Sequence, residues 1–150
     1  MNKVELISEN KNYTAVNVGS MDQLSEHSLI HPVSKRVIEG KVFLKDPTKA
    51  TGTEISFNTL PPNTELSYFH IHIQNEETYI IIKGKGDFQV DDDCIPVTEG
   101  SVIRVAPKGV RSLRNTSSEA MVYIVIQSKE GSLVQHSSAD GERLEYKKAW

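Results

Sequence analysis

Residues 69–84 read FHIHIQNEETYIIIKG, and the rest of the chain is organised around this stretch. In a β-strand, side chains two positions apart point to the same face, so His70 and His72 are expected to share one face. A polar turn at 74–75 follows, and a second strand then runs from a carboxylate through an apolar series to Gly84. Two imidazoles and a carboxylate form a nitrogen and oxygen set that suits a divalent transition metal. The stretch therefore predicts a metal site without indicating a reaction.

The length and composition of the chain are typical of one globular domain. Its 150 residues fit a single core, and 37% apolar with 25% charged residues argues against disorder. The net charge is −3 with acids and bases interspersed, so no surface for nucleic acid or membrane lipid is predicted. The chain start lacks the apolar core of a signal peptide, and the apolar run 120–126 is too short to span a bilayer. Cys94 is the only cysteine, so no internal disulfide can form and a reducing, cytoplasmic location is expected.

Short β-rich segments separated by turns follow one another along the chain. One helical turn is expected over 21–27, with Ser20 as its N-cap, and residues 141–150 are expected to form a short helix or an edge strand. Regularly spaced strands with almost no helical periodicity indicate an antiparallel sandwich or barrel. The strands are expected over 3–8, 13–18, 36–44, 54–60, 87–90, 95–97, 101–105, 111–114 and 121–127.

The histidine stretch resembles the first motif of the cupin superfamily. That motif reads glycine, then five residues, H-x-H, three or four residues, glutamate, six residues and glycine. Here His70 and His72 are followed after four residues by Glu77, and six more residues lead to Gly84. The spacing selects Glu77 over its neighbour Glu76, because only Glu77 leaves six residues before the glycine.

The second cupin motif is present in altered form over residues 100–115. The family pattern is glycine, five residues, Pro-x-Gly, two residues, histidine, three residues and asparagine, whereas Pro107 is displaced here by one position. Counting from the ends of the motif places Arg111 at the family's histidine, and counting from Pro107 places Ser112 there, so neither count gives a histidine. The leading glycine of the first motif is also missing, and the nearby Asn63 is the residue best able to replace it in a left-handed turn.

The resemblance implies an all-β fold, a double-stranded β-helix or jelly-roll barrel, in one cupin domain over residues 1–150. Its parts are N-terminal strands or an arm at 1–40, a barrel core at about 41–127 and a polar tail at 128–150. Cupins include isomerases, dioxygenases, decarboxylases, binding modules and storage proteins, so the fold alone does not fix a function.

The metal ligands that the resemblance implies are His70, His72 and Glu77, for iron, manganese, zinc or nickel. Two histidines and one carboxylate suffice for the facial triad of non-haem iron sites, which leaves positions open for substrate, oxygen or water. The sequence does not identify catalytic residues beyond these ligands.

Five further residues are candidates for binding a ligand in the barrel pocket. Arg111 or Arg114 could clamp a carboxylate or phosphate, the alternative being an arginine paired with an acid at the rim. Ser112 is a candidate through its place in the second motif. Tyr68 and Tyr79 share strand parity with the metal ligands, so they could line the pocket or pack in the core.

The expected function is a metal-binding cupin that acts on or binds a small polar or anionic organic molecule, by oxygenase or isomerase chemistry. A non-catalytic binding or sensor module is the alternative, and a storage-type cupin without a functional metal is the third possibility. His27, His31 and His136 lie outside the motifs and are expected to be exposed.

The face opposite the metal ligands predicts a partner. Phe69, Ile71 and Ile73 on one strand, with Ile80 and Ile82 on the next, are expected on an outer face that should alternate apolar with polar residues if solvent covered it. The cover is expected to be residues 1–40 or a second subunit, and a homodimer is favoured.

Overall fold

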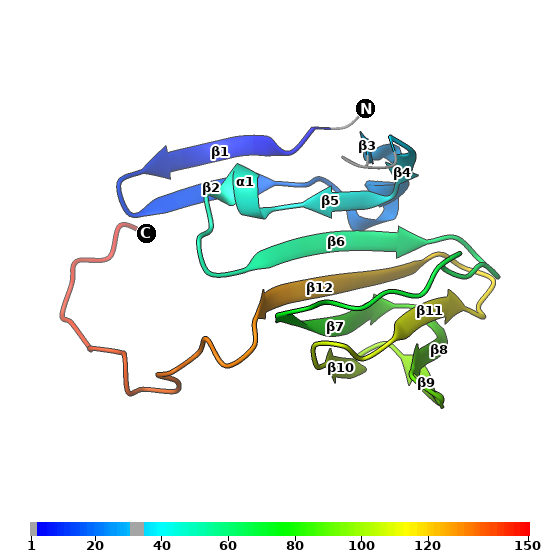
Figure 1. Ribbon diagram of the computed structural model, residues 1–150. Coiled ribbons are helices and arrows are strands. Elements are labelled where there is room, and N and C mark those ends of the chain that lie inside the picture. Colours follow the sequence, from blue (N-terminus) through cyan, green and yellow to red (C-terminus); the bar gives the residue numbers. More distant parts are fainter. Residues whose placement is uncertain (1–2, 31–34) are drawn as a thin grey trace.

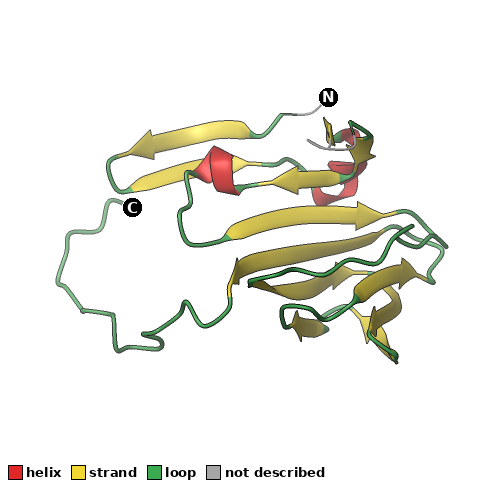
Figure 2. Cartoon of the chain, in the orientation of Figure 1, coloured by secondary structure: helices red, strands yellow, loops and turns green. Residues whose placement is uncertain are grey.

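The computed structural model describes residues 3–30 and 35–150, and almost all regular structure in that part of the chain is strand (Figure 2). A 3-10 helix, η1 (Met21–Glu26), and a short α-helix, α1 (Lys45–Thr48), are the helices of the described residues, and neither is long and apolar enough to cross a membrane. The strands are β1 (Glu5–Asn10), β2 (Tyr13–Asn17), β3 (Ser28–Ile30), β4 (Val37–Glu39), β5 (Lys41–Phe43), β6 (Glu54–Leu60), β7 (Asn75–Lys83), β8 (Lys85–Val90), β9 (Asp93–Thr98), β10 (Val102–Val105), β11 (Arg111–Asn115) and β12 (Met121–Lys129).

Two antiparallel sheets form the body of the molecule. One is five-stranded in the order β10-β7-β12-β6-β5, and the other is three-stranded in the order β11-β8-β9 (Figure 1). Their inner side chains pack together, and Tyr79 of β7 meets Phe88 of β8 edge to face with ring centroids 4.7 Å apart. Burying each large apolar side chain contributes about 1.5–3 kcal/mol, which makes this shared core the main stabilising element. The core comprises Leu60, Tyr79, Ile81, Phe88, Val97, Val105, Leu113, Met121, Tyr123 and Val125.

The segment that carries the histidines does not form the predicted strand. Its residues pair with β11 through isolated bridges, and at His70 the two main chains exchange hydrogen bonds with Arg111 at 3.3 and 3.1 Å. The segment also does not pair with β7, the strand that carries Glu77. Both edges of β7 are already taken, by β10 and β12, so the histidine segment adds to the other sheet. The turn before it uses Asn63 at φ 52°, the left-handed conformation expected of the missing glycine.

The N-terminal residues cover part of the outer face of the five-stranded sheet. The β1-β2 hairpin and η1 contribute Val16 and Leu24 to a second apolar cluster, which rests on Val42 and Val122. The predicted cap is present, since Ser20 Oγ accepts a hydrogen bond from the Asp22 amide at 3.3 Å.

The structure tests the predicted exposure of His27 and His136 and the predicted secondary structure of residues 141–150. His27 is 4% exposed, so its predicted exposure is wrong: its Nε2 lies 2.9 Å from the Val18 carbonyl oxygen, under the N-terminal layer. His136 is exposed as expected, and His31 lies outside the described residues. Residues 141–150 form neither a helix nor a strand, and their large apolar side chains, Leu144, Tyr146 and Trp150, remain exposed.

The apolar outer residues lie on two faces and not on one. Phe69, Ile71 and Ile73 are 54%, 45% and 73% exposed beside β11, whereas Ile80 and Ile82 belong to the five-stranded sheet. The expectation of one outer face is therefore wrong, because the histidine segment lies along β11 and not beside β7.

Candidate functional site

Three potential metal ligands meet between the two sheets. His70 and His72 come from the segment along β11, and Glu77 comes from β7 in the facing sheet. One ligand atom from each of the three lies within 4.8 Å of the other two. His72 Nε2 is 3.1 Å from Glu77 Oε1, and His70 Nε2 is 3.5 Å from Glu77 Oε2. The structure thus brings together the three predicted ligands.

The nitrogen atoms at this site fit a cation. His72 Nε2 and His70 Nδ1 are buried without a hydrogen-bond partner in the described part of the chain. The other His72 nitrogen, Nδ1, lies 3.2 Å from Gln127 Nε2, which holds the ring in place. An unpartnered buried imidazole nitrogen is unfavourable, and coordination of a divalent metal would satisfy His72 Nε2, which faces Glu77 Oε1. The donor set therefore fits a metal held by two histidines and one glutamate.

Arg111 shares this site and is 0% exposed. Its Nη2 and Nε donate to Glu77 Oε2 at 2.8 and 3.1 Å, and its Nη1 donates to the Gly109 carbonyl at 2.8 Å. The Tyr79 hydroxyl donates to the same carboxylate oxygen at 2.6 Å. Oε2 is therefore fully engaged, and Oε1 is the oxygen left for a metal.

These donors set the charge of the carboxylate. Burial alone raises the pKa of the Glu77 carboxyl, but the donors His70, Tyr79 and Arg111 outweigh burial and hold its pKa well below the usual range. Burial, followed by the adjacent Glu77, raises the pKa of the Tyr79 phenol far above its ordinary value. Glu77 is thus an anion and Tyr79 a neutral donor over the physiological range.

Arg111 takes the inward position at which the second motif has its histidine. A guanidinium cannot ligate a cation, and one beside a dication is repelled unless an anion lies between them. Glu77 is that anion, because it offers Oε2 to Arg111 and Oε1 toward His72. The arginine is accordingly neither a rim residue nor free to clamp a ligand.

A cavity of about 660 Å³ opens beside the ligands, within the usual size range for small-molecule sites. The predicted Tyr68 and Tyr79 both line it. Burial, and to a lesser extent Glu77, raises the pKa of the Tyr68 phenol. The remaining lining residues are Arg36, Val37, Ile38, Lys41, Leu66, Ser67, His70, Glu77, Tyr123 and Val125.

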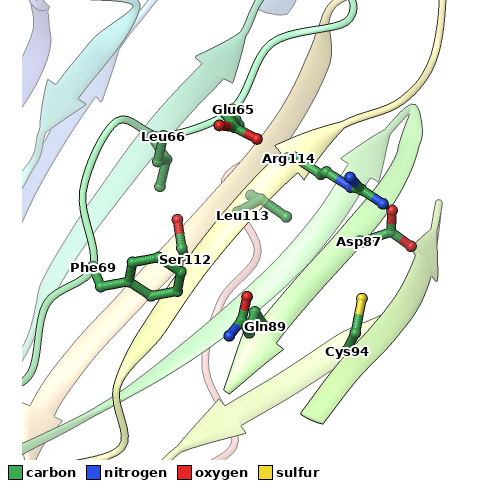
Figure 3. A pocket seen from close by; sticks show the side chains of 9 residues that line it. All are labelled: Glu65, Leu66, Phe69, Asp87, Gln89, Cys94, Ser112, Leu113 and Arg114. Carbon is green, nitrogen blue, oxygen red and sulfur yellow. The ribbon is translucent and has the colours of Figure 1, made fainter. Parts of the chain in front are cut away.

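Ser112 and Arg114 point away from this cavity. Both line a separate cavity of about 240 Å³, which Figure 3 shows. Ser112 Oγ donates to the Tyr68 carbonyl at 3.2 Å, and Arg114 Nε donates to Asp87 Oδ2 at 2.7 Å. Arg114 therefore matches the alternative of a surface arginine paired with an acid.

The sequence reasoning overlooked Lys41 and Arg36, the two cations that line the large cavity. Lys41 lies on β5, whose inward positions are Lys41 and Phe43 and whose outward Val42 packs under the N-terminal layer. A lysine beside a glycine turn usually faces solvent, and the Lys-Val-Phe pattern would place the valine inward. No signal in the sequence would have shown that Lys41 faces the cavity and Val42 faces the N-terminal layer.

The neighbouring acid Glu76 faces the other way, as strand parity predicts. It accepts a hydrogen bond from Arg104 Nε at 2.7 Å on the outer face, where Arg104 also pairs with Glu130. Glu76 is therefore a matched control for Glu77, with the same side chain one position away and outside the site.

Comparison with known proteins agrees with this geometry. The cupin domain family matches residues 56–127, which include all three candidate ligands. No curated protein matches the chain. Among solved structures, a predicted oxalate decarboxylase from Thermotoga maritima is 20% identical with TM-score 0.56, covering 69% of this chain and 90% of that one. A candidate sugar phosphate isomerase from Acidithiobacillus ferrooxidans is 22% identical with TM-score 0.57, and the match covers 68% of this chain and 66% of that one. At such identities these two show the fold alone.

A cupin protein from Bacteroides fragilis is nearer in sequence. It is 36% identical, its TM-score is 0.67, and the match covers 70% of this chain and 89% of that protein. The all-β architecture described above is the double-stranded β-helix of these proteins. With this identity over most of the relative's length, and with both histidines and the glutamate at the motif positions, the chain belongs to the cupins.

Proposed function

We propose that this cupin binds a divalent transition metal through His70, His72 and Glu77 and holds a small polar or anionic organic molecule beside it. One observation carries the proposal: two of the three converging ligands, His70 and Glu77, also form the wall of the 660 Å³ cavity. A molecule in that cavity would therefore touch the metal's open positions. We propose that the whole chain, 1–150, forms one such domain, with 1–40 as an arm over the sheet.

The residues of the chain have distinct parts in this site. Arg111 and Tyr79 fix the Glu77 carboxylate by holding Oε2, so that Oε1 faces His72. Gln127 orients the His72 ring. Tyr68 and Tyr123 line the cavity beside the site. The metal, when bound, would supply Lewis-acid or redox chemistry for isomerisation or oxygenation of the organic molecule.

A non-catalytic binding or sensor module is the second candidate. Among the described residues that line the large cavity, Glu77 is the one carboxylate, and it is already committed to Arg111 and Tyr79. Isomerisation needs a group that accepts a proton from the substrate, and a carboxylate with so low a pKa is a poor acceptor. This observation favours oxygenase chemistry or binding without turnover over isomerisation.

Metal binding is the first test. His72→Ala should lower the affinity for Co(II) or Ni(II) by at least about 100-fold. Removing a residue that only hydrogen-bonds to a metal ligand already lowers metal affinity by about 10–100-fold, and His72 is itself a ligand. Glu76→Gln should leave the affinity within about twofold, because Glu76 faces outward onto Arg104. Calorimetry measures the metal affinity of both variants, and their metal content is determined on protein prepared without a histidine tag. Equal losses in Glu76→Gln and Glu77→Gln would refute the assigned ligand set.

We also propose that the protein is a homodimer in a reducing, cytoplasmic compartment. The free and exposed Cys94 supports the compartment. The dimer is supported by apolar outer positions of the five-stranded sheet that the N-terminal arm leaves open, such as Val102 at 61% exposure.

A further inference from the structure

Lys41 is a cation without an acidic partner beside the candidate site. It lines both the large cavity and a smaller cavity of about 140 Å³, which His70, His72 and Glu77 also line. Within residues 3–30 and 35–150 its ammonium makes no ion pair, and it lies over the Phe43 ring, 4.7 Å from the ring centroid. A half-buried ammonium in that setting can still gain a charge-assisted hydrogen bond.

The two carboxylates that act on the charge of Lys41 make their hydrogen bonds elsewhere. Burial lowers the pKa of the Lys41 ammonium, and Glu77 and Glu54 act against that decrease only at a distance. Glu77 is held by Arg111, while Glu54 Oε1 accepts from the Leu44 and Lys45 amides at 3.0 and 2.8 Å. Arg36 adds a second positive charge to the cavity lining. The cavity therefore carries unpaired positive charge that an anion would neutralise.

Apart from Ser67 and His70, the rest of the lining is aliphatic or tyrosine. Leu66 and Val125 form part of the wall, and the Tyr79 and Tyr123 rings stack at 6.4 Å with an angle of 23°. The Tyr79 hydroxyl is already committed to Glu77, so it has no donor left for a ligand. Such a surface gains more from an apolar ligand body than from the hydroxyl groups of a sugar.

We propose that the cavity selects a small organic acid with an apolar or aromatic body, and that Lys41 binds its acid group. The inference deepens the proposed function, on which it rests for the position of the ligand. Lys41 is the specificity-determining residue, and the tyrosine wall receives the body. Arg36 stands at the cavity as a second, weaker partner for the anion.

The test compares acids with neutral analogues of the same shape. Calorimetry in EDTA measures binding of 3-phenylpropionate, its amide and glucose 6-phosphate to the full chain. We expect the acid to bind at least about tenfold more tightly than the amide, as expected for one charge-assisted contact, and the sugar phosphate to bind more weakly than the acid. Equal affinities for acid and amide, or tighter binding of the sugar phosphate, would overturn the proposal.

Two lysines of the same segment provide the matched variants. Lys41→Met should abolish the preference for acid over amide, and Lys41→Arg should retain most of it. Lys45→Met should leave both affinities within about twofold, because Lys45 is exposed and pairs with Asp46 outside the cavity. Circular dichroism verifies that each variant is folded. An unchanged acid preference in folded Lys41→Met would refute the role of Lys41.

The outcome separates this inference from the proposed metal function. Acid binding that depends on Lys41, in a protein that fails to bind metal, would uphold the inference and refute the metal proposal. Metal binding lost in His72→Ala, together with no preference for acids, would uphold the metal proposal and refute the inference.

Discussion

At the scale of single residues, Arg111 sets this site apart from a cupin centre with three histidines. The sequence left Arg111 and Ser112 as alternatives, because the two ways of counting the motif differ by one residue. Strand alternation decides between them: Arg111 and Leu113 face inward in β11, and Ser112 faces outward. A shift by one residue in a strand exchanges its two faces, so counting alone could not settle the choice.

Removing Arg111 should destabilise the fold strongly. Arg111→Met leaves the buried Glu77 carboxylate without its main partner, and breaking a buried pair in this way costs about 3–5 kcal/mol. Urea unfolding of the metal-free protein measures the change. Arg111→Met with Glu77→Gln should recover part of the loss, because no charge is then left buried. Arg114→Met, on the outward face of the same strand, should have little effect. If Arg111→Met and Arg114→Met have equal effects, the buried pair does not support the fold.

Tyr123 should make stability depend on alkaline pH. Burial raises the pKa of its phenol well above the ordinary value of 10.0. The unfolded chain therefore loses this proton first as the pH rises, so the contribution of Tyr123 to stability is complete below pH 10 and declines above it by about 1.4 kcal/mol per pH unit. Urea unfolding between pH 8 and 11 should show a shallower decline for Tyr123→Phe. Tyr146→Phe, at a 94% exposed position, is the control. Parallel curves for wild type and Tyr123→Phe would contradict the prediction.

At the scale of elements, local patterns predicted much of the fold. The predicted strand 54–60 has the bounds of β6, and the predicted turn 21–27 became η1, because alternation and N-capping act within a few residues. Parity also separated the inward Glu77 from the outward Glu76.

The predictions that were wrong concern features that depend on residues far away in the sequence. The histidine segment adds to β11 because other strands occupy both edges of β7. The residues within the segment carry no information about which strands pair with β7. His27 is buried by residues of the N-terminal layer, and Lys41 faces inward because Val42 packs outward against Leu24. The candidate ligands could be predicted, since their spacing is local, whereas the cavity lining arises from several elements and could not.

At the scale of the whole molecule, the outer face of the five-stranded sheet is only partly covered. The N-terminal arm packs over β5, β6 and the start of β12, where Val122 is buried. Farther along the same face, Val102 and Ile82 are 61% and 38% exposed. These two residues lie on β10 and on β7, which are neighbours, so they form one open apolar strip.

A second copy of the chain should cover this strip. Because Val102 is exposed in the single chain, Val102→Glu should leave the fold intact and should dissociate the dimer by placing a charge at its interface. Light scattering coupled to size-exclusion chromatography at micromolar concentration should give twice the 16.8 kDa chain mass for the wild type and the chain mass itself for Val102→Glu. Leu133→Glu, at a 77% exposed position outside the strands, should remain dimeric. A monomeric wild type would exclude the dimer and leave the arm as the sole cover of the sheet, and a dimeric Val102→Glu would place the interface on another face.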